Sequence, residues 1–299
     1  MRIIVIGSAA GGGSPQWNCN CAVCCLHWAG DPRVKRRTQS SLAVSIDGES
    51  WALLNCSPDI LEQIGKTRAL QPKGATRHSP IKSIVLTNGD IDHIGGLLNL
   101  REKQPLAIWA GSKVLAQLQE NPVFGVLDRQ LVTFNEVHAK VGFSPLPGLD
   151  MEFFAVPGKV PLYREENNTP MISRDGNTFG LHLRDGMSHV SYVPGCADLD
   201  AQLLHDLQEC QTLFFDGTLF TDQEMIESGT GQKTGRRMGH LPVSGADGSI
   251  AGLKSLNAAQ RIFIHMNNTN PMLIDGSQQQ AYAEQHGWRV GFDGMEFLV

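Results

Sequence analysis

The stretch VLTNGDIDHIGGL at residues 85–97 decides how the rest of the chain is interpreted. An apolar run at 81–87 predicts a buried strand, and Asp90, Asp92 and His93 follow directly after it. A loop at the end of a strand can aim several side chains at one point, and carboxylate with imidazole suits iron, manganese or zinc. The alternative is an acidic surface turn in which an aspartate caps a helix. We therefore expect a metal site here.

This pattern resembles the H-x-H-x-D-H-x-x-G signature of the metallo-β-lactamase superfamily. Asn88 and Asp90 stand where the first two histidines are expected, whereas Asp92 and His93 match. The resemblance implies that Asp92 and His93 are metal ligands and that Asp92 belongs to the catalytic centre. Asp90 can still bind the metal through a carboxylate, whereas Asn88 is a poor ligand.

The resemblance continues toward the end of the chain. The segment IFIH ends at His265, which the resemblance implies as a further metal ligand. The segment MGH ends at His240, which it implies as a catalytic polariser or proton shuttle. A histidine after a strand can also be purely structural. Because the motifs follow one another in the same order as in the superfamily, we favour a metal-ligand role for His265.

Two ligands that the superfamily uses are absent from the sequence. Lys159 stands near the mid-chain histidine, and Gly195 or Cys196 stands near the bridging aspartate, with Asp198 or Asp216 as substitutes. A dinuclear centre uses about six ligands to hold two ions roughly 3.5–4 Å apart. We therefore expect a single metal on two histidines and one or two carboxylates, which is typical of non-haem Fe(II), with Mn or Zn as alternatives.

A second motif, C-x-C-x-x-C, is formed by Cys19, Cys21 and Cys24. Three thiolates so close together favour a structural zinc site, while a redox pair would follow a thioredoxin-type strand that is missing here. The motif, in an insertion near residues 15–30, resembles the zinc site of PhnP-type phosphodiesterases. The fourth ligand stays open among four candidates, which are His27, Cys25, Asn268 and water.

Hydrophobic periodicity predicts two β-sheets with covering helices. The resemblance implies an α/β fold, a four-layer αββα sandwich of the metallo-β-lactamase type, formed by residues 1–299 as one domain. The glycine-rich segment 7–13 lacks the spacing of a phosphate-binding loop and is expected to be a plain turn. Strands are expected at 2–6, 42–46, 51–55, 81–87, 108–109, 131–134, 151–156, 179–183, 189–193, 212–215, 261–265 and 289–293. Helices are expected at 58–64, 97–101, 113–120 (capped by Ser112), 198–208, 248–255 and 277–286.

Composition narrows the function classes. The net charge of −5 over 299 residues argues against a nucleic-acid-binding protein. No apolar run reaches the roughly 18–20 residues that span a bilayer, so we expect no membrane span. The clustered cysteines fit metal binding in a reducing cytoplasm, where we expect the protein to act.

Four stretches together resemble the PqqB family of pyrroloquinoline quinone (PQQ) biosynthesis over essentially the full chain; they lie at residues 7–21, 87–93, 238–242 and 265–271. The resemblance implies an iron-dependent oxygenase that hydroxylates the tyrosine ring of a cross-linked Glu–Tyr intermediate from the PqqA peptide, alongside other PQQ-pathway proteins. One alternative is a carrier that moves PQQ or its precursor to the periplasm. A second is a metal-dependent hydrolase, the common chemistry of the superfamily.

Such a substrate is small, aromatic and anionic. The loop KTGRRMGH at 233–240 places cations just before His240, and arginine binds carboxylates in a bidentate manner. We predict that Lys159, Arg236 and Arg237 bind substrate carboxylates. The alternative is that these are solvated surface charges.

Overall fold

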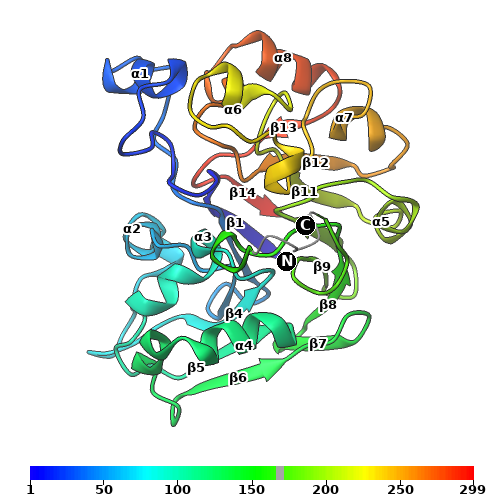
Figure 1. Ribbon diagram of the computed structural model, residues 1–299. Helices are drawn as coiled ribbons and strands as arrows, with labels where there is room; N and C mark the ends of the chain where they lie inside the picture. Colours follow the sequence, from blue (N-terminus) through cyan, green and yellow to red (C-terminus); the bar gives the residue numbers. More distant parts are fainter. Residues whose placement is uncertain (166–171) are drawn as a thin grey trace.

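The computed structural model describes residues 1–165 and 172–299, which form two seven-stranded sheets (Figure 1). The first sheet has the order β14-β1-β2-β3-β4-β5-β6. Its strands are β1 (Arg2–Gly7), β2 (Ser41–Ser45), β3 (Trp51–Leu54), β4 (Ile81–Leu86), β5 (Leu106–Ala110), β6 (Val132–Glu136) and β14 (Glu296–Leu298).

The second sheet has the order β13-β12-β11-β10-β9-β8-β7. Its strands are β7 (Gly142–Leu146), β8 (Leu149–Ala155), β9 (Phe179–Arg184), β10 (His189–Val193), β11 (Thr212–Asp216), β12 (Gln260–Ile264) and β13 (Arg289–Val290). Strands β3 to β6 run parallel in the first sheet, and β10 to β13 run parallel in the second. Because the carboxyl ends of parallel strands meet at one edge, residues that follow β4, β11 and β12 can converge.

The helices cover the outer faces of the sheets. Helices α2 (Ile60–Lys66) and α4 (Ser112–Glu120) pack on the first sheet, and α5 (Ala201–Asp206), α7 (Ser249–Gly252) and α8 (Gln278–Gln285) pack on the second. Three shorter helices are α1 (Ala22–Trp28), α3 (Ile91–Ile94) and α6 (Glu224–Glu227).

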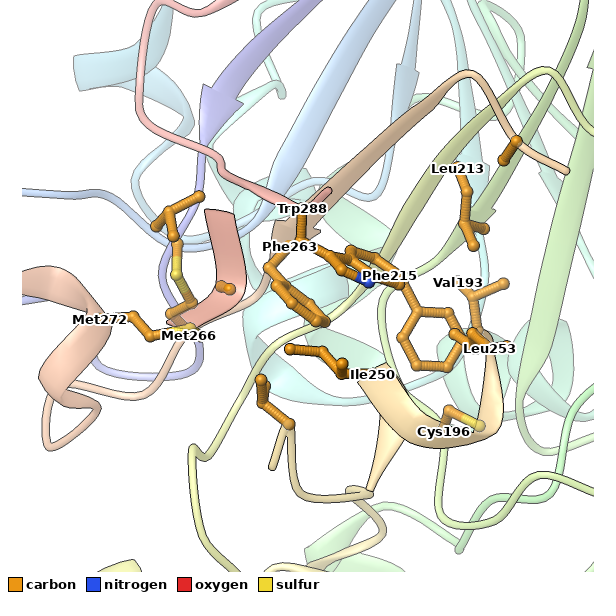
Figure 2. Packing of buried hydrophobic residues seen from close by; sticks show 14 of the residues in the cluster. Val193, Cys196, Leu213, Phe215, Ile250, Leu253, Phe263, Met266, Met272 and Trp288 are labelled. Atoms are coloured by element: carbon orange, nitrogen blue, oxygen red, sulfur yellow. The ribbon is translucent and has the colours of Figure 1, made fainter. Parts of the chain in front are cut away.

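Alternation along the strands separates the apolar side chains into three layers. Val85 and Phe214 point into the core between the sheets, whereas their neighbours Ile84 and Phe215 point to the outer helices. Figure 2 shows the outer layer of the second sheet, where Phe263 stacks on Trp288 with ring centroids 4.1 Å apart. Three apolar layers between four layers of secondary structure confirm the predicted αββα sandwich.

Most predicted elements are present, with shifted ends. Ser112 is wrong as a cap, because Gly111 is the N-cap residue of α4 and no side chain bonds there. The helix predicted at 198–208 begins only at Ala201, because the Asp200 side chain accepts a hydrogen bond from Leu203 N and caps it. The 97–101 helix is instead a 3-10 helix over Gly95–Asn99. Among the strands and α-helices of the described residues, periodicity missed five short elements, which are β7, β14, α1, α3 and α6.

The glycine-rich segment is a turn, as predicted, and it is tied to the end of β12. Ala10 N donates to the carbonyl of Met266 at 2.8 Å, and Met266 N donates to Ser8 O at 2.9 Å. Gly12 and Gly13 have φ of +91° and +71°, values that favour glycine. Within residues 1–165 and 172–299, no helix is long and apolar enough to cross a bilayer.

Candidate metal centre

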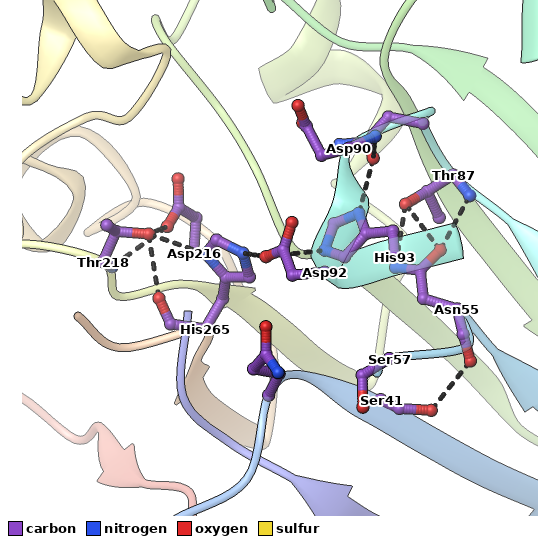
Figure 3. Close-up of polar contacts among 12 residues, drawn as sticks. Ser41, Asn55, Ser57, Thr87, Asp90, Asp92, His93, Asp216, Thr218 and His265 are labelled. Carbon is purple, nitrogen blue, oxygen red and sulfur yellow. Dashed lines mark hydrogen bonds and ion pairs between the residues drawn. The ribbon is translucent and has the colours of Figure 1, made fainter. Parts of the chain in front are cut away.

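Three side chains from the two sheets point toward one another at the carboxyl ends of the strands (Figure 3). Asp92 and His93 lie in α3 after β4, and His265 directly follows β12. Asp92 Oδ2 lies 3.0 Å from His265 Nε2 and 3.9 Å from His93 Nε2. One ligand atom of each residue lies within 4.8 Å of the others. The structure thus brings together three of the four ligands predicted for the active-site metal.

The imidazole of His93 is oriented by Asn88. Asn88 Oδ1 accepts a hydrogen bond from Asp90 N at 3.0 Å and lies 2.6 Å from His93 Nδ1, so His93 donates from Nδ1 and keeps its lone pair on Nε2. That buried Nε2 has no hydrogen-bond partner in the described part of the chain. Burial lowers the pKa of His93 to about 4, so the ring is neutral near pH 7. An orphaned, neutral nitrogen fits a metal ligand.

His265 is oriented in the same way by Thr218. Asp216 Oδ1 can only accept from the Thr218 hydroxyl, 2.6 Å away, so that hydroxyl must in turn accept from His265 Nδ1, at 2.8 Å. Burial lowers the pKa of His265, but the hydrogen bond and charge of Asp92, with the charges of Asp216 and Asp90, together outweigh burial and hold the pKa above its ordinary value. A metal would therefore replace the proton that His265 Nε2 and Asp92 share.

Asp90 lies beside this group but outside it. The carboxyl lines the same cavity, but Asp90 belongs to neither of the two candidate metal groups that described side chains form here, Asp92–His93–His265 and Asp216–His240–His265. Burial, with the charge of Asp92, raises the pKa of Asp90 to about 6. The assignment of Asp90 as a fourth ligand stays a prediction.

His240 and Asp216 form a hydrogen-bonded pair next to the group. His240 Nδ1 donates to Asp216 Oδ2 at 2.7 Å, and the His240 ring stacks on His265 with centroids 5.2 Å apart. The fully buried Asp216 also accepts from the backbone N of Cys196 and of Thr218, at 2.9 and 3.0 Å. Burial raises the pKa of Asp216, but the interactions with His240, His265 and Thr218 together outweigh burial and lower the pKa below its ordinary value. His240 lines the cavity, and because its Nδ1 donates to Asp216, its Nε2 keeps a lone pair that can accept a proton.

A cavity of about 570 Å³ opens above these residues. Lys159 and Lys233 line it, together with His240 and the three clustered side chains. Arg236 pairs with Asp247 at 2.8 Å and Arg237 is exposed. Neither arginine belongs to the described lining of the cavity, so of the three predicted carboxylate binders only Lys159 reaches it. Lys233, which also lines the cavity, is not among the predicted carboxylate binders.

The three cysteines of the C-x-C-x-x-C motif meet at Asn268. The Asn268 amide nitrogen lies 3.1, 3.6 and 3.3 Å from the sulfurs of Cys19, Cys21 and Cys24. His27 Nδ1 instead contacts the carbonyl of Val34 at 3.0 Å, and Cys25 is exposed. Because amide O and N are assigned only by their surroundings, this side chain can offer its oxygen to a cation at the fourth corner.

Comparison with known proteins gives a consistent result. Residues 50–266 match the model of the β-lactamase superfamily domain. The chain is 49% identical to coenzyme PQQ synthesis protein B of Methylobacterium nodulans over 295 residues, 99% of each chain. It is 50% identical to the protein of the same name from Rhizobium meliloti over 298 residues, covering 99% of this chain and 97% of that one.

Solved structures agree. The crystal structure of Zn²⁺-bound PqqB from Methylobacterium extorquens superposes with a TM-score of 0.99 at 45% identity, covering 100% of both chains. A diphosphatase of the PhnP family superposes with a TM-score of 0.69 at 19% identity, covering 100% of this chain and 97% of that one. The second likeness shows the shared fold alone.

Proposed function

The chain belongs to the coenzyme PQQ synthesis protein B (PqqB) family of the β-lactamase superfamily, and on that premise we propose that it is an iron-dependent oxygenase of PQQ biosynthesis. Its substrate is the cross-linked Glu–Tyr intermediate derived from the PqqA peptide, hydroxylated on the tyrosine ring. The observation that carries the proposal is the convergence of Asp92, His93 and His265. Two histidines and one carboxylate with open positions are typical of non-haem Fe(II) oxygenases, with Mn or Zn as alternative ions.

The protein's own side chains define the centre. Asn88 and Thr218 hold His93 and His265 so that both Nε2 atoms face Asp92. The bound ion would supply dioxygen activation at the positions that these three ligands leave open. His240 Nε2 accepts the proton of the substrate phenol, and Asp216 stabilises the imidazolium that results.

The geometry favours one ion over two. Asp216, His240 and His265 form a second group that could hold an ion, but four donors already occupy the two oxygens of Asp216. A two-metal hydrolytic centre would have to break these bonds. This supports oxygenation over hydrolysis as the chemistry of the site.

An oxygen-consumption assay tests the function. The protein is loaded anaerobically with Fe(II) and mixed with the cross-linked intermediate, dioxygen and a reductant such as ascorbate, because hydroxylation puts one oxygen atom into the ring and reduces the other to water with two electrons. We expect oxygen uptake and a hydroxylated ring. Tight PQQ binding without product would favour a carrier, and phosphodiester or acyl cleavage with Zn or Mn would favour a hydrolase.

Asn88 offers a sharp test of ligand orientation. We expect Asn88→Leu to weaken active-site metal affinity by about 10–100-fold, because His93 loses the acceptor that fixes its ring. Asn88→Asp keeps an acceptor oxygen and serves as the matched control. Competition with a chelator measures both affinities, and equal affinities in Asn88→Leu and wild type would contradict the role.

We further propose that Cys19, Cys21 and Cys24 hold a structural zinc, with the Asn268 amide oxygen at the fourth position. Burial raises the pKa of Cys21 to about 12 when no cation is bound, and zinc would offset that cost by stabilising the thiolate. Asn268 lies three residues after His265, so the zinc would also anchor the segment that leaves the active site.

Replacing Cys21 by serine is expected to remove one zinc per chain. Tm should fall by roughly 5 °C or more, since each kcal/mol lost lowers the Tm of a chain of this size by about 2 °C. Cys25→Ser is the matched control, because Cys25 is exposed and lies outside the cluster. Metal analysis and calorimetry measure both effects, and unchanged zinc content in Cys21→Ser would disprove the assignment.

A further inference from the structure

Glu165 bridges the two lysines of the cavity. Lys159 Nζ lies 3.3 Å from Glu165 Oε1, and Lys233 Nζ lies 3.1 Å from Glu165 Oε2. Both lysines line the cavity that contains the metal ligands. One carboxylate is therefore already held between the two cations best placed to bind an anionic ligand there.

The position of Lys159 is built into the backbone. Gly239 has φ of +90°, and a Cβ at that residue would lie 3.0 Å from Lys159 Cγ. The absence of a side chain lets the lysine stem lie against the residue that precedes His240. Lys159 and His240 both line this cavity.

The charges of the trio do not cancel. Burial raises the pKa of Glu165, but its bonds to Lys233 and Lys159 outweigh this and keep the carboxyl ionised. Two ammonium groups share one carboxylate, so the trio carries a net positive charge. The side chains are 18% (Lys159), 20% (Glu165) and 41% (Lys233) exposed, and ion pairs that reach solvent are individually weak. Exchange of one carboxylate for another between these lysines therefore costs little.

We propose that Glu165 is an internal competitor, which occupies the carboxylate position between Lys159 and Lys233 and is displaced by a carboxylate of the ligand. The ligand class is an aromatic polycarboxylate, and this part rests on the proposed function. Glu165 thus makes the cavity select anions that can outcompete a carboxylate. Neutral or singly charged aromatic molecules gain too little from the lysines to do so.

The test is Glu165→Gln with PQQ as the probe, measured as an equilibrium Kd without turnover. Loss of the competing charge is expected to lower the Kd about two- to fivefold, the range of one partly exposed ion pair. A Kd that rises would mean that Glu165 only positions the lysines, which would overturn the proposal. An unchanged Kd would overturn it as well.

A double-mutant cycle separates exchange from a general change in charge. The gain from Glu165→Gln should vanish in a Lys159→Met/Lys233→Met background, whereas a gain that persists there would contradict the proposal. Glu120→Gln removes the same charge from a pair with Arg164 and should leave the Kd unchanged. The Kd is measured without catalysis, so the two proposals can fail separately. A lower Kd in Glu165→Gln, together with no hydroxylated product in the oxygen-consumption assay, would refute the oxygenase and leave the internal competitor standing.

Discussion

Replacing His93 by alanine is expected to empty the active-site metal position and to lower hydroxylation by more than about 100-fold. Three described side chains form the ligand group, and His93 supplies a buried nitrogen with no other partner among the described residues. Loss of residues that merely orient a ligand costs about 10–100-fold, so loss of the ligand itself should exceed that range. Iron content after anaerobic loading and the rate with the cross-linked intermediate measure the two effects.

His138→Ala is the matched control, because His138 is a 73% exposed histidine outside the metal cluster. The zinc proposed for the cysteine site should remain in both variants, since His93 and the cysteines belong to separate groups. Full iron content in His93→Ala would contradict the assignment of the ligand group.

Replacing His240 by asparagine is expected to lower kcat by about 100- to 10,000-fold while the metal stays bound. The range is that of a general base in proton transfer, and His240 is held for this role by its 2.7 Å bond to Asp216. The variant therefore separates catalysis from metal binding, which His93→Ala does not. Single-turnover rates and iron content measure the difference.

His205→Asn, at an exposed position of α5, provides the control for His240. It should match the wild type in rate and iron content. Turnover at the wild-type rate in His240→Asn would show that the phenol proton leaves by another route, and loss of iron would show that His240 is a ligand.

Much of the fold follows from the sequence. The buried strands of the two sheets have apolar runs that end at polar residues. The D-x-D-H pattern indicates at the end of which strand the candidate metal ligands lie. Periodicity also gave the covering helices, although their ends depended on local caps such as Asp200. Very short elements such as β14 carry too few residues for periodicity to detect. A single domain over residues 1–299 stays a prediction.

The supporting residues of the site were harder to predict, because they act through contacts between distant segments. The sequence indicates only that Asn88 is a poor metal ligand, whereas in the structure its side chain orients the imidazole of His93. Thr218 was missed, and Asp216 was considered only as a bridging ligand; the one available signal was its position at the end of a strand parallel to β12. Arg236 was expected in the cavity, but Asp247 holds it outside. Charge in a sequence does not reveal such pairing.

The most direct test of the central claim is a single turnover under ¹⁸O₂. The protein, loaded anaerobically with one Fe(II) per chain, is mixed with the cross-linked intermediate, a two-electron reductant such as ascorbate and labelled dioxygen, and the product is analysed by mass spectrometry. We predict a hydroxylated tyrosine ring whose new oxygen carries the label from dioxygen. No hydroxylated product, or a product whose new oxygen comes from water, would contradict the oxygenase.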